Sequence, residues 1–249
     1  MDAEKGGAME AVWVINWLLD RRGEGRKNGG MYLGFVDLKE AFGSVDRQFL
    51  WRELARLGID EGLRMAVKGL YRDLRVEIWV DGEERGGFYT RKGIRQGRPL
   101  SATLFNVYMA SLEGWMKGRQ VGGVRIGSMV VRTLFYVDDV VLLAGERKEL
   151  REMLSEFVRW CQRRGLEVNV GKSKVLIGKK GRCKGKEAWH YRGEELEKAR
   201  RIKYLSFWVA RKGESSWHVR DRVQKARRIM GRVWGWRKEN LGVTCGSGE

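Results

Sequence analysis

A pair of adjacent aspartates between two apolar runs constrains the fold of this chain more than any other feature. The runs cover residues 130–136 and 140–144, and the turn between them contains Asp138 and Asp139. This pattern predicts a β-hairpin with two carboxylates at its tip. Carboxylates beside apolar strands are costly to bury without a partner, and a divalent cation is a natural partner because it prefers oxygen ligands. The alternative is an ordinary exposed turn, in which aspartates are common.

A second apolar segment also ends in an aspartate. Residues 31–37 (MYLGFVD) predict a buried strand whose last residue is Asp37, although Asp37 could instead cap a following helix. If the two acid-tipped strands are neighbours in one sheet, all three carboxylates can meet around a metal pair. Two ions about 3.5–4 Å apart are the arrangement used in phosphoryl transfer.

A basic, glycine-rich loop precedes a helix that we expect to begin near Ser101. The loop starts at Gly93, reads GIRQGRPLS, and contains Arg95, Gln96 and Arg98. Backbone N–H groups at a helix start and nearby arginine side chains favour contacts with phosphate groups or with a nucleic-acid template. A plain loop with a serine helix cap is the alternative interpretation.

Positive charge is the strongest bulk property of the chain. Its 249 residues include 50 Lys and Arg against 32 Asp and Glu, which gives a net charge of +18. A field of this sign attracts polyanions, of which nucleic acid is the most common, and no basic amphipathic anchor points to a membrane instead. The three cysteines are widely spaced and form no CxxC pair, which argues against a disulfide framework or a structural zinc site. No apolar run is long enough to predict a transmembrane helix.

The remaining periodicities predict an α+β fold in which helices cover an antiparallel sheet. The clearest helix has apolar residues at a spacing of three to four along its whole length. We expect helices at 9–20, 46–57, 61–72, 101–117, 148–164 and 214–235. We expect strands at 31–37, 74–80, 86–90, 130–136, 140–144 and 173–178, and an irregular basic segment at 179–200.

Five segments, in their order and spacing, resemble motifs A to E of reverse transcriptases. Their sequences are most similar to those of enzymes from non-LTR (LINE-like) retrotransposons, and the resemblance covers about residues 8–210. The segments are FVDLKEAFGSVDR, GIRQGRPLSATLFNVYMASLE, LFYVDDVVLLA, GLEVNVGKSKVLI and IKYLSF.

The resemblance implies the palm of a right-hand polymerase. Residues 1–210 would form this palm with part of the fingers, and residues 211–249 would begin a helical thumb with a basic helix and a frayed tail. The implied activity is that of an RNA-directed DNA polymerase, with an RNA template, a DNA primer and deoxynucleoside triphosphates as partners. The same resemblance implies an intracellular location, in the nucleus or the cytoplasm, and no membrane partner.

The resemblance also assigns the metal site. Asp37, Asp138 and Asp139 match the three catalytic carboxylates, and the main-chain carbonyl of Leu38 would complete the site. Two Mg²⁺ ions would bind there, and Mn²⁺ could replace them.

Further residues are assigned to substrate binding by the same resemblance. Phe42 matches the bulky residue that excludes a ribose 2′-hydroxyl, and Gln96 matches the glutamine that lines the nucleotide pocket and template. Either Lys172 or Lys174 would neutralise the leaving pyrophosphate, and the sequence does not choose between them. The other nucleotide-binding candidates are Ala41, Gly97 and Tyr136, and the nucleic-acid-binding candidates are Arg95, Arg98, Arg220, Lys225 and Arg228.

Four positions depart from the pattern of these enzymes, although none removes a metal ligand. Gly43 replaces an aspartate, Ala102 replaces a proline, and Arg98 replaces a small residue at a place where a long cation could obstruct the template or nucleotide. Ser206 replaces a glycine, and it would be strained if its backbone requires a positive φ.

Upstream fingers segments, an endonuclease and separate nucleic-acid-binding modules are expected to be missing from the chain. An inactive, truncated remnant that only binds nucleic acid is therefore the alternative to an active polymerase. A palm-type nucleotide cyclase would share the paired acids but not the RQGRPLS and YVDD segments.

Overall fold

The computed structural model describes residues 3–20, 30–72, 74–179, 188–210 and 224, and its centre is a mixed β-sheet. The strand order is β10-β11-β9-β1-β7-β6, with β8 paired to the end of β1. Every pairing in this sheet is antiparallel except that of β11 with β9. The strands are β1 (Gly30–Lys39), β6 (Thr133–Tyr136), β7 (Asp139–Ala144), β8 (Glu167–Val168), β9 (Lys174–Lys179), β10 (Trp189–Tyr191) and β11 (Glu194–Ala199).

Strand β1 occupies a central position because nearly all of its residues are apolar and both of its faces are covered. Val36 and Leu38 belong to one core cluster, whereas Leu33 and Phe35 belong to the other. Successive side chains of a strand point to opposite faces, so the two clusters lie on opposite sides of the sheet. The aspartate at position 37 therefore points to the same face as Phe35.

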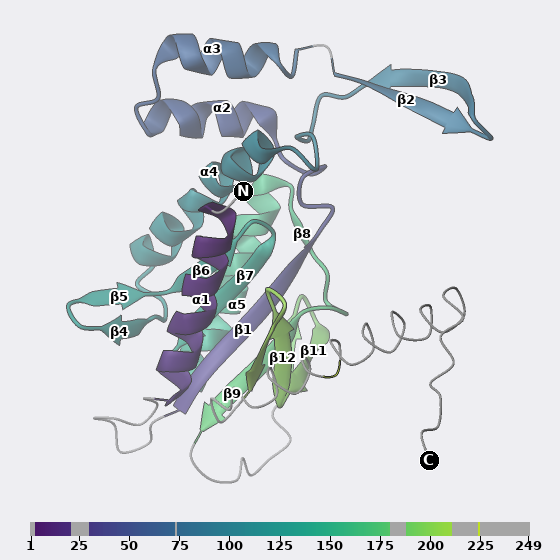
Figure 1. Ribbon diagram of the computed structural model, residues 1–249. Helices are drawn as coiled ribbons and strands as arrows, with labels where there is room; N and C mark the ends of the chain where they lie inside the picture. The colour runs from purple at the N-terminus through teal and green to yellow at the C-terminus, as the bar shows by residue number, and fades with distance from the viewer. Residues whose placement is uncertain (1–2, 21–29, 73, 180–187, 211–223, 225–249) are drawn as a thin grey trace, which may run out of the picture.

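Two layers cover the sheet. Helices α4 (Pro99–Gly118) and α5 (Arg147–Arg164) pack on one face, where Leu150, Leu154 and Phe157 enter the larger core cluster. Helix α1 (Ala3–Asp20) lies across the other face, beside the hairpin of β12 (Arg201–Tyr204) and β13 (Phe207–Ala210), as Figure 1 shows. The α+β prediction with helices on an antiparallel-rich sheet is confirmed.

A smaller part of the chain extends away from the sheet (Figure 1). It consists of two helices and a two-stranded hairpin whose strands are exposed along most of their length. Asp46 and Asp60 cap the two helices through side-chain hydrogen bonds to backbone N–H groups, as expected for aspartate at a helix start. These elements are α2 (Arg47–Arg56), α3 (Glu61–Gly69), β2 (Arg75–Val80) and β3 (Glu83–Tyr89).

The structure corrects two of the predicted elements. The segment 179–200 is not irregular throughout, since it contains β10 and β11. The apolar run 130–136 is not one strand: its first part belongs to β5 (Met129–Val131), which pairs with β4 (Val124–Ile126), and β6 begins only at Thr133. Within the described residues, no helix is both long and apolar enough to cross a lipid bilayer.

Apart from residue 224, the predicted helix 214–235 lies outside the described residues, together with Arg220, Lys225 and Arg228. The division of the chain at residue 210 therefore stays a prediction.

Candidate active site

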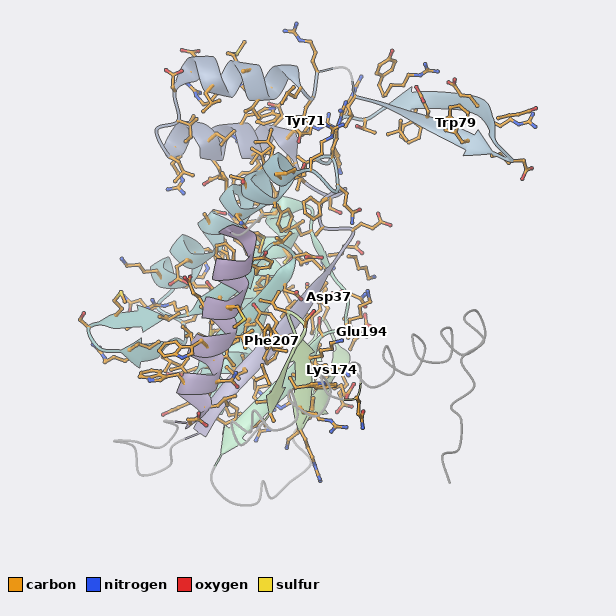
Figure 2. The ribbon with its side chains drawn as sticks, viewed as in Figure 1. Asp37, Tyr71, Trp79, Lys174, Glu194 and Phe207 are labelled. Carbon is orange, nitrogen blue, oxygen red and sulfur yellow. The ribbon has the colours of Figure 1, made fainter. Side chains whose placement is uncertain are left out.

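Strand pairing brings two of the three predicted carboxylates together. In the antiparallel pair of β1 and β7, Asp37 is the direct partner of Asp139. Residues opposite each other in such a pair have Cα atoms about 4.5–5.5 Å apart, and their side chains point to the same face. Figure 2 shows Asp37 near the end of β1. Both aspartates are half-buried.

The third carboxylate lies in the turn between β6 and β7. Tyr136 and Asp139 form the last pair of this hairpin, so Val137 and Asp138 make the turn. Val137 has a φ of +55°, which is a strained conformation for a β-branched residue. Its N–H donates to the side-chain oxygen of Asn106 on α4, at 3.3 Å. This contact holds the turn against α4.

A separate set of hydrogen bonds fixes the backbone of Asp37. Its N–H donates to the hydroxyl of Ser173 at 3.1 Å, and its carbonyl accepts from the N–H of Asn169 at 2.9 Å. The Ser173 hydroxyl in turn donates to the Asn169 carbonyl at 2.8 Å, and Ser173 is only 1% exposed. The loop before β9 is thereby attached to the end of β1.

The carboxyl group of Asp139 is affected by its burial and by the charges of Asp138 and Asp37. The pKa of Asp139 is raised from its ordinary value to about 6, mainly by burial and to a lesser degree by the charges of Asp138 and Asp37. A cation between these groups would relieve the repulsion, and carboxylates suit a hard divalent ion. Within the described ranges, no three His, Cys, Asp or Glu side chains already surround such a position.

The structure separates the two candidate lysines. The ammonium group of Lys172 lies 4.0 Å from a carboxylate oxygen of Asp37. That of Lys174 lies 2.6 Å from a carboxylate oxygen of Glu197 on β11 instead. A pocket of about 560 Å³ opens beside Asp37, and Lys172 but not Lys174 lines it. The full lining is Asp37, Leu38, Lys39, Glu40, Ser44, Gly165, Glu167, Asn169 and Lys172.

The segment after β1 connects the carboxylates to the glycine-rich loop. The ring of Phe42 packs on Phe105 of α4 with centroids 5.3 Å apart, and the Phe42 carbonyl accepts from the N–H of Ile94 at 2.8 Å. Gly93 has a φ of +80°, and a Cβ there would lie 2.9 Å from the carbonyl oxygen of Gly43. Glycine is therefore required at position 93 for this close approach.

The remaining candidates of this region have contrasting environments. Ala41 is buried in the core, whereas Arg95, Gln96, Gly97 and Arg98 are exposed. None of these five residues lines the pocket beside Asp37, so Arg98 does not fill it. Their assignment to nucleotide or nucleic acid stays a prediction.

The β12–β13 hairpin contributes a buried tyrosine to the same region. The ring of Tyr204 packs edge-on against Phe35, with centroids 5.4 Å apart. Its hydroxyl is buried without a hydrogen-bond partner among the described residues, and its pKa is raised by burial and by the charge of Asp139. In the turn that follows, Ser206 has a φ of +67°. The position does require a left-handed backbone, so serine is strained there.

Sequence reasoning did not identify Asn106, Ser173 or Tyr204. Ser173 stands between the two candidate lysines, and its position just before a buried strand was a usable signal. Asn106 is about 30 residues away in sequence from the turn at Val137 and Asp138, and Tyr204 is about 65 residues away from Asp139. Local sequence patterns do not predict contacts over such separations.

Comparisons with known proteins identify the family of this chain. A family model described as "Reverse transcriptase (RNA-dependent DNA polymerase)" matches residues 14–209. A Pol polyprotein of the type-1 retrotransposable element R2 from Popillia japonica is 32% identical over 177 residues, which are 69% of this chain and 25% of that protein. The RNA-directed DNA polymerase from mobile element jockey of Drosophila funebris is 24% identical over 55% of this chain and 15% of its own length. The chain spans about a quarter or less of the length of such relatives.

A solved structure shares the fold. Telomerase from Candida tropicalis, in complex with a fragment of telomeric RNA, aligns with a TM-score of 0.56 at 11% sequence identity. The alignment covers 82% of this chain and 32% of the telomerase chain. At this identity the likeness supports the polymerase palm as the fold of the sheet and its helices.

Proposed function

The chain belongs to the reverse transcriptase family, in its non-LTR retrotransposon branch, and we propose that Asp37, Asp138 and Asp139 are its catalytic carboxylates. The proposed reaction is the template-directed transfer of a deoxynucleotide to a primer 3′-hydroxyl. The observation that carries this proposal is the pairing of Asp37 with Asp139 across β1 and β7, which joins residues 102 positions apart. A surface turn or a helix cap would not require that pairing.

The proposed cofactor is a pair of Mg²⁺ ions, for which Mn²⁺ could substitute. The three aspartates and the carbonyl of Leu38 would hold them, since all are hard oxygen ligands at one end of the sheet. Bound there, the ions would activate the primer hydroxyl and stabilise the leaving pyrophosphate. The chain's own contribution is positioning: Ser173 and Asn169 fix the backbone of Asp37.

Lys172 is the lysine that we assign to the pyrophosphate side of the site. It lies beside Asp37 and lines the adjoining pocket, whereas Lys174 is engaged by Glu197. Phe42, packed on Phe105, is assigned to exclusion of the 2′-hydroxyl, and Gln96 to contact with the nucleotide or template. Ala41, Gly97 and Tyr136 are the further nucleotide-binding candidates.

The proposed partners are an RNA template and a DNA primer. A polymerase must accept any sequence, so it grips nucleic acid through phosphates, and a net charge of +18 suits that role. The relatives named above are polymerases of mobile elements, and the telomerase neighbour was solved with RNA. Arg95 and Arg98, in the loop before α4, are the described residues that we assign to this contact.

The test is primer extension on an RNA template with Mg²⁺ and deoxynucleotides. We expect extension by the parent chain and none by Asp138→Asn combined with Asp139→Asn. Asp81→Asn is the matched control, since Asp81 lies in the exposed turn between β2 and β3. Extension by the double variant would disprove the assignment. If no variant extends the primer but salt-sensitive RNA binding is retained, the chain is a nucleic-acid-binding remnant.

A further inference from the structure

We propose that a basic pocket between α4 and α5 is a second RNA-binding site, distinct from the pocket beside Asp37. It has a volume of about 360 Å³, and we call it the arginine pocket. Its lining is Trp115, Arg119, Arg159, Gln162 and Arg163, none of which lines the pocket beside Asp37. Its chemistry is that of a phosphate site, because the lining has three guanidinium groups and no carboxylate.

Two of the three arginines are held by an aromatic ring. The guanidinium carbon of Arg119 lies 4.0 Å from the centre of the Trp115 ring, and that of Arg163 lies 5.1 Å from it. Stacking on an indole restrains a guanidinium group while its N–H donors stay available at the edges. The arginines are thus oriented before any ligand binds, which reduces the entropic cost of binding.

A buried carboxylate orients the third arginine. Glu156 is 8% exposed and forms ion pairs with both Arg119 and Arg159, the latter at 2.5 Å. One carboxylate cannot neutralise three guanidinium groups, so the pocket keeps a positive excess of two charges. Each guanidinium group has five donors, so donors remain for a phosphate after the ion pair is made.

The arginine pocket continues along α5. A neighbouring pocket of about 310 Å³ shares Arg159 and extends to Arg151, and Glu152 and Glu156 also line it. Arg151, Ser155, Arg159 and Arg163 recur at every fourth residue, so they lie on one face of the helix. The row is about 18 Å long at 1.5 Å per residue. That length is enough to span more than one phosphate of a nucleic-acid strand.

RNA is the occupant that these features favour. Arginine forks match the geometry of phosphate oxygens, and a row of them along a helix suits a regularly charged polymer better than a single small anion. The site would hold RNA outside the catalytic centre, and its existence does not depend on polymerase activity.

The test measures RNA binding without Mg²⁺ or nucleotides, so its result is independent of catalysis. The probe is a fluorescein-labelled single-stranded RNA of about 20 nucleotides, followed by anisotropy over a salt series. Arg151→Gln, Arg159→Gln and Arg163→Gln are combined in one variant. The matched control combines Arg52→Gln, Arg85→Gln and Arg125→Gln, which are exposed on other elements and remove the same charge.

We expect the triple variant to bind RNA about tenfold more weakly, and its salt slope to fall by about 2, because three phosphate contacts contribute about 0.7 each for single strands. In the control, the change in the logarithm of the RNA dissociation constant should be less than a third of that in the triple variant. Equal losses in the two variants would show that only net charge matters and would overturn the proposal. A second result would also overturn it. If polyglutamate competes with RNA for the parent chain but not for the triple variant, and the triple variant still binds RNA normally, the pocket binds acidic polypeptides and not RNA.

A conservative variant tests the built geometry. Arg119→Lys with Arg163→Lys keeps both charges but removes the stacked forks, and we expect about threefold weaker RNA binding. Unchanged affinity would contradict the role of Trp115 and the oriented arginines. Circular dichroism checks that each variant is folded, and these side chains are exposed enough for the substitutions to be tolerated.

Discussion

Arg47 offers the sharpest test of how the part of the chain beyond the sheet is held in place. It is the first residue of α2, is 6% exposed, and donates five hydrogen bonds, none of them to a carboxylate of the described residues. Its acceptors are the carbonyls of Gly93 (2.6 Å), Tyr71 (3.2 Å), Thr90 (2.7 Å) and Lys92 (2.9 Å) and the Thr90 hydroxyl (2.8 Å). The side chain thus joins α2 to the segment that leads into the glycine-rich loop.

The change Arg47→Met keeps the aliphatic stem and removes all five donors. Only the bonds to Gly93 and Tyr71 are buried, whereas those to Thr90 and Lys92 are partly exposed, so water can replace the donor there. Two buried acceptors at about 1.5 kcal/mol each give a loss of about 3 kcal/mol in the free energy of unfolding.

The assay is urea unfolding followed by tryptophan fluorescence. Arg52→Met on the same helix is the control, because Arg52 is exposed and lies over the ring of Phe49, a contact worth about 0.5–1 kcal/mol. A loss for Arg47→Met no larger than that of Arg52→Met would refute the reasoning. It would mean that the buried carbonyls find other donors.

Three further predictions concern the candidate active site and the residues around it. Ser206→Gly should raise the free energy of unfolding by about 0.5–1 kcal/mol, because Ser206 has a φ of +67°, and a destabilised variant in urea unfolding would contradict the strain. Phe42→Ala should admit ribonucleotides in primer extension, since it removes the proposed steric block, and unchanged sugar discrimination would remove Phe42 from that role. The pKa of Asp139 is raised to about 6, mainly by burial and also by its two acidic neighbours. At a pH between its ordinary pKa and about 6, the folded chain therefore holds a proton on Asp139 that the unfolded chain releases. Without metal, stability should therefore fall as pH rises from about 4 to about 6. In Asp139→Asn, the urea midpoint should no longer fall over this pH range. If the midpoint of the variant depends on pH as that of the parent does, the pKa of Asp139 is not raised.

The local features of the site could be predicted from the sequence. An apolar run that stops at Asp37 and a hairpin with acids at its tip are short-range patterns, and the structure has both. That β1 and β7 are neighbours is a long-range fact, which periodicity does not contain. Only the resemblance to motifs of a known family implied it.

The wrong prediction for segment 179–200 explains why the sequence did not choose between Lys172 and Lys174. The segment Glu194–Ala199 (EELEKA) is charged at four of six positions, so its single buried Leu196 did not predict a strand. Yet β11 pairs with β9 and places Glu197 opposite Lys174. Because this strand was not predicted, the ion pair between Glu197 and Lys174 was not predicted either. Without that ion pair, Lys172 and Lys174 could not be distinguished.

A crystal structure of the chain with Mn²⁺ would test the central claim most directly. The account predicts two anomalous peaks about 3.5–4 Å apart, between the carboxylate of Asp37 and those of Asp138 and Asp139. Asp37→Asn should reduce the occupancy of both peaks. Carboxylates that stay apart with no ion between them, or Mn²⁺ bound only elsewhere, would contradict it.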